Sequence, residues 1–195
     1  MLIALLSDIH SNREAFSVCL AHAEQQRADR FILLGDLVGY GADPAWVLDR
    51  VMEMTAKGAV TLLGNHDEAV FASSNRLNPT AQKAIEWTRG VLGESHRKFL
   101  AALPLAHEED GRLFVHSNPA DPPMWTYIDD RHMAALSLKG TSNWQVYCGH
   151  VHVPAIYHLS AAGKLLDFKP VTGIGVPMTR ARRWLAVLGS VGQPR

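Results

Sequence analysis

Three features are scarce in this 195-residue sequence: cysteine, an excess of one charge, and repeated or low-complexity segments. Cysteine occurs only as Cys19 and Cys148, so a disulfide framework is not indicated, and we expect both thiols to be reduced and buried. Basic and acidic residues number 19 each, so no net field favours nucleic acid, and no basic run favours a membrane surface. Partners must therefore be inferred from a site.

The apolar start of the chain lacks the features of a signal peptide. Residues 1–6 have no positive region before them, are too few for a signal core and run directly into the polar Ser7 and Asp8. We therefore expect a cytoplasmic protein. With 47% hydrophobic residues, the chain is long enough for one domain, residues 1–195, that buries about 70% of its unfolded surface.

Five short apolar runs each end in side chains that can bind a metal ion. The clearest is residues 31–36, where Phe-Ile-Leu-Leu is followed by Gly35 and Asp36, a pattern typical of a strand buried on both faces. The candidate ligands at the five ends are Asp8, His10, Asp36, Asn65, His116, His150 and His152. Because ligands of an open α/β sheet bind outside the carboxyl ends of its strands, we expect these side chains to meet at one rim.

The ligand types indicate which ions they would hold. Two carboxylates, four imidazoles and one amide oxygen, without a thiolate, suit divalent Mn, Fe, Zn, Ni or Co. Seven ligands are too many for one ion, but two ions about 3.5–4 Å apart could share them through a bridging carboxylate. Two divalent cations against two aspartates leave positive charge, which favours an anionic phosphate ester or hydroxide as the remaining ligand. We therefore expect a substrate that carries negative charge.

The motifs resemble a known family. In order, the chain contains Asp8-x-His10, Gly35-Asp36-x-x-Gly39-x-Gly41, Gly64-Asn65-His66-Asp67, His116 and Gly149-His150-x-His152. This series resembles the calcineurin-like metallophosphoesterase superfamily, and the resemblance extends from the first strand to the last residues. The subgroup that it resembles most is the small bacterial phosphodiesterase-like proteins. The chain departs from them in having Ser117-Asn118-Pro119 after His116 and in stopping at Arg195, where related sequences continue, so we expect an exposed strand edge.

The resemblance implies two divalent metal ions that share Asp36. The ligands that it implies for one ion are Asp8, His10, Asp36 and His152. The ligands that it implies for the other are Asp36, Asn65, His116 and His150.

The same resemblance implies attack on a phosphodiester or phosphomonoester by a metal-bound hydroxide. His66, which is not needed as a ligand, would protonate the leaving group. Asp67 either caps a helix or holds the tautomer of His66. Arg13 and Arg195 are candidates to bind the phosphate oxygens.

Two alternative functions stay open. Protein serine/threonine phosphatases of this family carry Asp-Arg-Gly where this chain has Gly39-Tyr40-Gly41, so the arginine that grips a monoester is absent, which favours diesters or nucleotides. The second alternative is a non-catalytic metal-binding scaffold of the same fold. The intact Gly64-Asn65-His66-Asp67 motif favours an enzyme.

The expected fold class is α/β, with two packed mixed β-sheets flanked by helices in a four-layer α/β/β/α sandwich. Periodicity and capping residues predict helices at 13–26, 44–57, 79–92, 94–102 and 133–138. Further strands are expected at 145–148, 155–159, 164–168 and 184–188. Proline and aspartate predict a loop over 117–130 beside the site.

The region of about 68–104 is a helical insertion with two open interpretations. In the first, the insertion is a cap over the site, and its polar side chains that could extend toward the site are Asn75, Arg76 and Asn78. As an ordinary helical hairpin, it would instead pack on the sheet. The residues expected in its core are Ile85, Trp87, Phe99 and Leu100.

Overall fold

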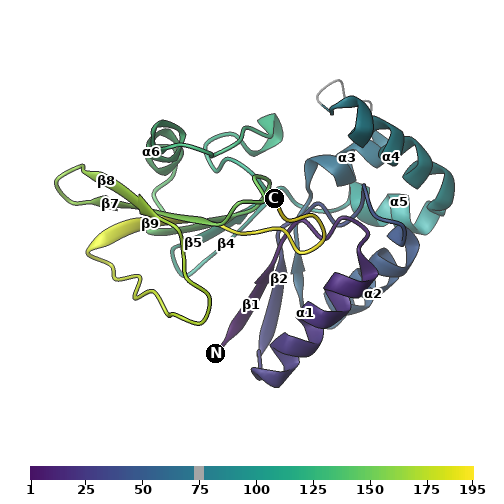
Figure 1. Ribbon diagram of the computed structural model, residues 1–195, viewed down its shortest axis with the longest axis horizontal. Coiled ribbons are helices and arrows are strands. Elements are labelled where there is room, and N and C mark those ends of the chain that lie inside the picture. Colours follow the sequence, from purple (N-terminus) through teal and green to yellow (C-terminus); the bar gives the residue numbers. More distant parts are fainter. Residues whose placement is uncertain (73–76) are drawn as a thin grey trace.

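The computed structural model describes residues 1–72 and 77–195, and its first half forms a parallel sheet with strand order β1-β2-β3 (Figure 1). The strands are β1 (Ile3–Leu6), β2 (Arg30–Leu33) and β3 (Val60–Thr61). Helices α1 (Arg13–Gln25) and α2 (Pro44–Ala56) connect them. These parallel crossovers bring the carboxyl ends of all three strands to one edge.

The two crossover helices begin where the sequence predicts. The Asn12 side chain caps α1 by accepting a 3.0 Å hydrogen bond from the Ala15 amide. In α2, Pro44 occupies the first turn, but Asp43 makes no side-chain capping bond. Both helices pack on one face of the first sheet, where Phe16 and Val47 are fully buried.

The second half of the chain forms a six-stranded mixed sheet with strand order β4-β5-β6-β9-β7-β8. Its strands are β4 (Ala106–Glu109), β5 (Arg112–Val115), β6 (Gln145–Cys148), β7 (Ala155–Ser160), β8 (Leu165–Phe168) and β9 (Arg182–Val187). The sequence analysis missed β4, which pairs with β5 through a two-residue turn at Asp110 and Gly111. Both turn residues have positive φ, +50° and +73°, as a type I′ hairpin turn requires.

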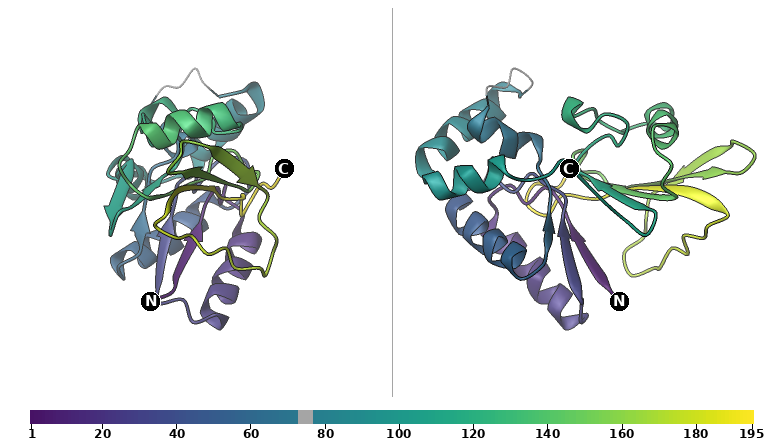
Figure 2. Two further views of the ribbon diagram at one scale, coloured as in Figure 1. Left: turned by 90° about the vertical axis from the view of Figure 1, so that its left-hand side faces the viewer. Right: turned by 180° about the vertical axis from the view of Figure 1, so that it is seen from behind.

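The predicted four-layer α/β/β/α arrangement is confirmed. Between the sheets, Ile32 and Leu34 of the first sheet pack against Phe114 of the second. Helix α6 (Arg131–Lys139) covers the far face of the second sheet, where its Leu138 is fully buried (Figure 2). An ion pair of 2.5 Å between Arg30 of β2 and Glu109 of β4 also joins the sheets.

The insertion contains α3 (Asn65–Phe71), α4 (Pro79–Val91) and α5 (Glu94–Ala101). Helix α3 contacts α4 and α5, and both α4 and α5 contact α2. The buried face of α4 consists of Ala81, Ile85 and Thr88. Trp87 lies off this face and is 49% exposed, so the prediction that it belongs to the core is wrong. Asn78, at the start of α4, lies beside the candidate site, whereas Asn75 and Arg76 lie outside the described residues.

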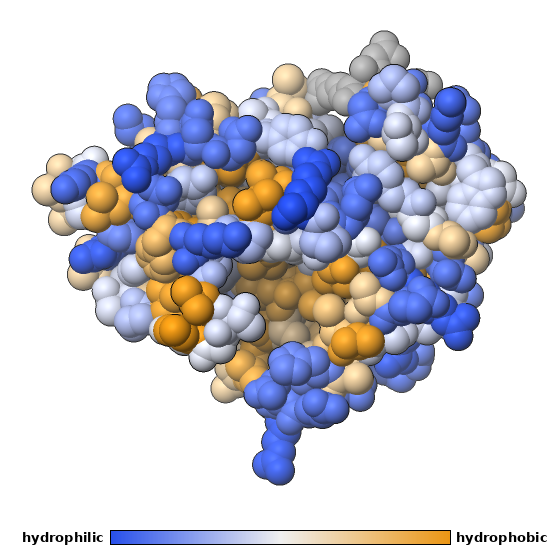
Figure 3. Space-filling model, viewed as in Figure 1, coloured by the Kyte–Doolittle hydropathy of each residue, from blue (hydrophilic) through white to orange (hydrophobic). Residues whose placement is uncertain are grey.

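The C-terminal segment returns to the ends of the first strands (Figure 1). The Val191 amide donates to the Ser7 carbonyl at 3.0 Å, and the Gly192 amide donates to the Asp8 carbonyl at 2.9 Å. Further from this edge the two sheets diverge, and Figure 3 shows an apolar hollow in that region. Of the cysteines, Cys148 is buried but Cys19 is partly exposed, contrary to expectation, and both are free. No helix among the described residues is long and apolar enough to cross a membrane.

Candidate metal centre

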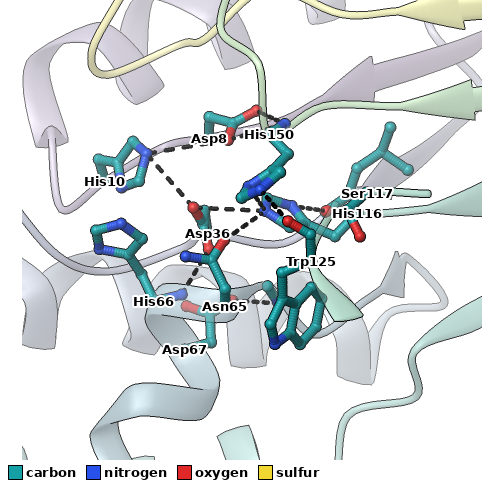
Figure 4. Close-up of polar contacts among 12 residues, drawn as sticks. Asp8, His10, Asp36, Asn65, His66, Asp67, His116, Ser117, Trp125 and His150 are labelled. Carbon is teal, nitrogen blue, oxygen red and sulfur yellow. Dashed lines mark hydrogen bonds and ion pairs between the residues drawn. The ribbon is translucent and has the colours of Figure 1, made fainter. Parts of the chain in front are cut away.

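Five of the predicted ligands lie in turns that force their backbone into the left-handed region. Their φ angles are +56° at Asp8, +50° at His10, +50° at Asp36, +68° at His150 and +67° at His152. Such angles are uncommon outside glycine and persist only where the surrounding structure holds them, often at functional sites. The turns aim side chains from separate strand ends into one space (Figure 4).

The first group consists of Asp8, His10, Asp36 and His152, all buried, with one ligand-type atom from each within 4.8 Å of the others. His152 Nε2 lies 3.2 Å from Asp8 Oδ1 and 3.1 Å from His10 Nε2. His10 Nε2 lies 3.6 Å from Asp36 Oδ2.

The second group consists of Asp36, His116 and His150, which are also buried. His116 Nε2 lies 3.2 Å from His150 Nδ1 and 3.1 Å from Asn65 Oδ1. The same Asp36 Oδ2 lies 3.5 Å from His116 Nε2. One carboxylate oxygen therefore adjoins both groups, and the structure brings all seven predicted ligands together.

Each of the four histidines donates the proton of its outward-facing nitrogen to a backbone carbonyl. The four contacts are His10 Nδ1 to Val38 at 3.1 Å, His116 Nδ1 to Leu34 at 2.8 Å, His150 Nε2 to Trp125 at 2.8 Å and His152 Nδ1 to Gln193 at 2.6 Å. In a neutral ring, this leaves the inward nitrogen with a lone pair.

The inward lone pairs provide a test of whether a cation fits. In each group two inward ring nitrogens face each other at 3.1–3.2 Å, and at least one of them also faces a carboxylate. When the rings are neutral, as metal binding requires, all of these atoms are acceptors. Acceptors cannot satisfy one another, whereas a divalent cation satisfies nitrogen and oxygen donors together. The residues present therefore fit divalent metal binding.

The charges in the cluster have the same implication. Burial raises the pKa of Asp36, but His116 and the other imidazoles outweigh this effect and hold it well below its ordinary range. Burial lowers the pKa of His116, but the Asp36 charge reverses this effect and raises it to about 9. For His10 and His150, burial dominates and lowers the pKa to about 4. The carboxylates therefore stay ionised beside positive charge, which the protonated His116 supplies in the metal-free protein and which a divalent cation would supply in its place.

His66 lies beside the first group without belonging to it. Its ring makes an edge contact with His10 at 4.8 Å between centroids and lies 4.7 Å from the ring of Tyr40. Its Nδ1 is buried, has no hydrogen-bond partner among residues 1–72 and 77–195, and faces Gly39. Burial lowers the pKa of His66, so the ring favours the neutral form.

Asp67 does not hold the His66 ring, so this part of the prediction is wrong. Its Oδ1 accepts from the amides of Leu37 and Val38 at 2.9 and 3.1 Å, and its Oδ2 accepts from the Gly64 amide at 3.0 Å. Burial and the Asp36 charge raise the pKa of Asp67 to about 8, whereas the three amides favour its ionised form. Asp67 therefore joins the turn after β2 to the start of α3, which is closer to the capping alternative.

The two predicted phosphate-binding arginines lie in different surroundings. The Arg13 guanidinium lies 4.9 Å from the centre of the Trp46 ring, and none of its described contacts reaches a predicted ligand. The charge of Arg195 lies close enough to Tyr40 to lower the pKa of its hydroxyl against the larger effect of burial. Arg195, unlike Arg13, therefore lies near a residue that lines the candidate site.

A pocket of about 90 Å³ adjoins His66, Asn65 and His150. Asn78, which the cap interpretation of the insertion placed over the site, also lines this pocket. The sequence analysis did not identify the other residues that complete it, which are Tyr40, Leu77, Ala81, Trp125 and Tyr127. The predicted loop over 117–130 does border the site, as expected, but periodicity gave no signal for its aromatic residues. Tyr40 could have been found from its position between Gly39 and Gly41.

Comparisons with known proteins agree with this geometry. An uncharacterised protein of Methanocaldococcus jannaschii is 32% identical over all of this chain and 77% of its own length. A symmetrical bis(5'-nucleosyl)-tetraphosphatase of Nitrosococcus oceani is 29% identical over 78% of this chain and 56% of its own length. The crystal structure of a metallophosphoesterase from Sphaerobacter thermophilus superposes with a TM-score of 0.84 at 31% identity, covering all of this chain and 79% of that one.

The family comparison covers every residue that builds the two groups. A model of the calcineurin-like phosphoesterase superfamily domain matches residues 1–195. The match thus includes both sheets and the strand ends that carry the clustered aspartates and histidines. This chain belongs to the calcineurin-like phosphoesterase superfamily.

Proposed function

We propose that the protein is a phosphoesterase that depends on two divalent metal ions. The observation that carries the proposal is the shared position of Asp36 Oδ2, 3.6 Å from His10 Nε2 in one group and 3.5 Å from His116 Nε2 in the other. One ion would be held by Asp8, His10, Asp36 and His152. The other would be held by Asp36, Asn65, His116 and His150. The donor set suits Mn, Fe, Zn, Ni or Co.

Divalent ions at these positions would polarise the phosphoryl group and lower the pKa of water. The residues of the chain supply orientation and a proton. The His66 amide donates to Asp36 Oδ1 at 2.8 Å, which fixes the start of α3 against the shared carboxylate. The same contact places the His66 side chain beside the cluster, within reach of an ester oxygen of a phosphate held there.

His66 is the proposed proton donor to the leaving group. Burial lowers its pKa, so in the free protein the ring is neutral at pH 7. An anionic phosphate would oppose this effect, because nearby negative charge favours the protonated imidazole. The proton would therefore be taken up with the substrate and given to the leaving alkoxide.

A phosphodiester or a nucleotide is the proposed substrate class. The position where related phosphatases carry an arginine is occupied by Tyr40, so a group that grips a monoester is absent there. The similarity to a bis(5'-nucleosyl)-tetraphosphatase supports nucleotides. Arg195 is the proposed contact for non-bridging phosphate oxygens. We also propose a cytoplasmic location, which suits the two free cysteines.

The test is a panel of metals against substrates. The protein is stripped of metal and reloaded with Mn, Co, Ni, Zn or Fe(II). It is then assayed with bis-p-nitrophenyl phosphate, p-nitrophenyl phosphate and a dinucleoside polyphosphate. We expect turnover of the diester or the nucleotide, abolished by chelator. Bound metal with no turnover of any substrate would instead favour the non-catalytic scaffold.

Substitution of His66 by Asn tests the proton donor. All seven proposed ligands stay in place, so metal content should be unchanged. The rate on an ester with a poor alcohol leaving group should fall about 10²–10⁴-fold. A p-nitrophenyl ester should lose less, because its leaving group needs little protonation. Equal losses on both esters would refute the assignment of His66 as the acid.

A further inference from the structure

Trp125 lies in the loop between β5 and α6, directly after the short 3-10 helix η1 (Pro122–Met124). Its backbone is left-handed, with φ of +52° and ψ of +36°, and the residue is only 7% exposed. A bulky side chain rarely adopts this conformation, which persists only where the surroundings hold it. Its contacts show what holds it.

Trp125 touches the second ligand group in two ways (Figure 4). Its carbonyl accepts the proton of His150 Nε2 at 2.8 Å, which leaves Nδ1 of that ring facing His116. Its indole ring meets the His116 ring edge-on at 5.8 Å between centroids. One residue thus contacts both histidines of this group.

The other side of the indole is anchored on α3. Its Nε1 donates to Glu68 Oε2 at 2.8 Å. Helix α3 begins at Asn65, whose side-chain amide oxygen completes the second group. The Glu68 contact therefore connects the loop of the second sheet with the helix that follows the first sheet.

We infer that Trp125 is a positioning residue for the second ligand group and that Glu68 is its anchor. This inference rests on the proposed function, because it assumes that His116, His150 and Asn65 bind an ion. Trp125 lies in no strand, and among the described residues its carbonyl contacts His150. The indole contact with Glu68 sets where that carbonyl lies, and the carbonyl sets the tautomer and direction of His150.

The same contacts distinguish positioning from packing alone. Trp125 contacts the second group and Glu68 contacts Trp125, and no described contact joins either residue to His10 or His152 of the first group. Loss of the anchor should therefore weaken one of the two ions. A residue that only fills space would change the free energy of unfolding without selecting one ion.

The experiment measures Co²⁺ binding to the full chain by calorimetry and by the visible absorption of the bound ion. The variants are Glu68→Ala, Trp125→Phe and their combination. Each single variant removes the same hydrogen bond and should weaken one of the two Co²⁺ ions by about 10–100-fold, the range for lost partners of metal-binding histidines. Both substitutions remove the same contact, so their effects should not add. The double variant should therefore bind Co²⁺ as tightly as the single variant with the lower affinity.

Two further variants complete the design. Glu68→Gln keeps an oxygen acceptor and should bind Co²⁺ like the wild type. Trp87→Phe is the matched control, because Trp87 is 49% exposed on α4 and belongs neither to the residues that line the pocket nor to the two ligand groups. It should leave both affinities and the absorption spectrum unchanged.

The outcomes separate this inference from the proposed function. A wild-type protein that binds no Co²⁺ would contradict the proposed function itself. A wild-type protein that binds two ions, with Glu68→Ala and Trp125→Phe binding both as tightly, would overturn the positioning role alone. Equal weakening of both ions, or losses that add in the double variant, would also overturn it.

Discussion

A methyl group added at Gly39 should disable His66 without removing any proposed metal ligand. Gly39 has φ of +90°, and a Cβ there would lie 2.4 Å from His66 Nδ1 and 3.2 Å from its Cγ. Ordinary contact begins at 3.4 Å, so the ring must move by about 1 Å. The neighbouring rings of His10 and Tyr40 restrict that movement.

The expected effects of Gly39→Ala follow from this displacement. Left-handed backbone costs a residue with a Cβ about 1–2 kcal/mol. Overpacking against His66 adds about 1–3 kcal/mol to the loss in free energy of unfolding. A shift of about 1 Å in a reacting group can cost about 10²-fold in rate, so an ester with a poor leaving group should be hydrolysed about 100 times more slowly. Metal content should stay unchanged.

Gly58→Ala is the matched control. Gly58 has φ of +101°, and a Cβ there meets nothing within 4 Å. It therefore carries the backbone strain without the collision. Urea unfolding, metal analysis and initial rates are measured on both variants. The reasoning is refuted if Gly39→Ala loses no more stability than Gly58→Ala and keeps the wild-type rate.

Three further predictions concern the shared ligand, metal removal and pH. Asp36→Asn should deplete both ions and His152→Ala mainly one, measured by metal analysis; full occupancy in the Asp36 variant would contradict bridging. Stripping the metals should lower the free energy of unfolding by about 2.7 kcal/mol for each ion lost, relative to protein in free metal at 100 times the dissociation constant of that ion; an unchanged melting temperature would contradict binding to the folded state. Burial raises the pKa of Glu109, but Arg30 outweighs it and leaves the pKa below its ordinary 4.5. Glu109→Gln should therefore lower the free energy of unfolding by about 1 kcal/mol at neutral pH, and this difference from the wild type should vanish as pH falls through the lowered pKa. Glu108→Gln is the exposed control. A difference in unfolding free energy that persists in acid would contradict the prediction.

The strand ends that carry the site could be predicted because each is a local pattern. A buried apolar run followed by a turn identifies Asp8 and Asp36 without knowledge of the rest of the fold. The polar strand β4 offered no such run, yet its Asp110-Gly111 turn is a hairpin signal that could have identified it.

The contacts between elements could not be predicted in the same way. Asp67 follows His66 in sequence, which suggested that the two side chains interact. In the folded chain the Asp67 carboxylate instead accepts hydrogen bonds from three backbone amides. Trp125 and Tyr127 join the site because a loop without periodicity folds back over it. Trp87 was assigned to the core from its residue type, although the buried face of α4 excludes it. These outcomes depend on tertiary geometry that local patterns do not contain.

The outward contacts of the four histidines have a consequence for how this protein can vary. Every acceptor is a main-chain carbonyl, which all twenty residue types possess, so replacement of the Val38, Leu34 or Gln193 side chain leaves the acceptor in place. An alanine scan would therefore miss these partners, and homologous sequences could differ there while the imidazoles keep the same tautomers. The histidine contacts therefore survive a change of side chain at these positions, although Val38 and Leu34 are also core residues. An insertion or deletion that shifts the main chain would break the contacts.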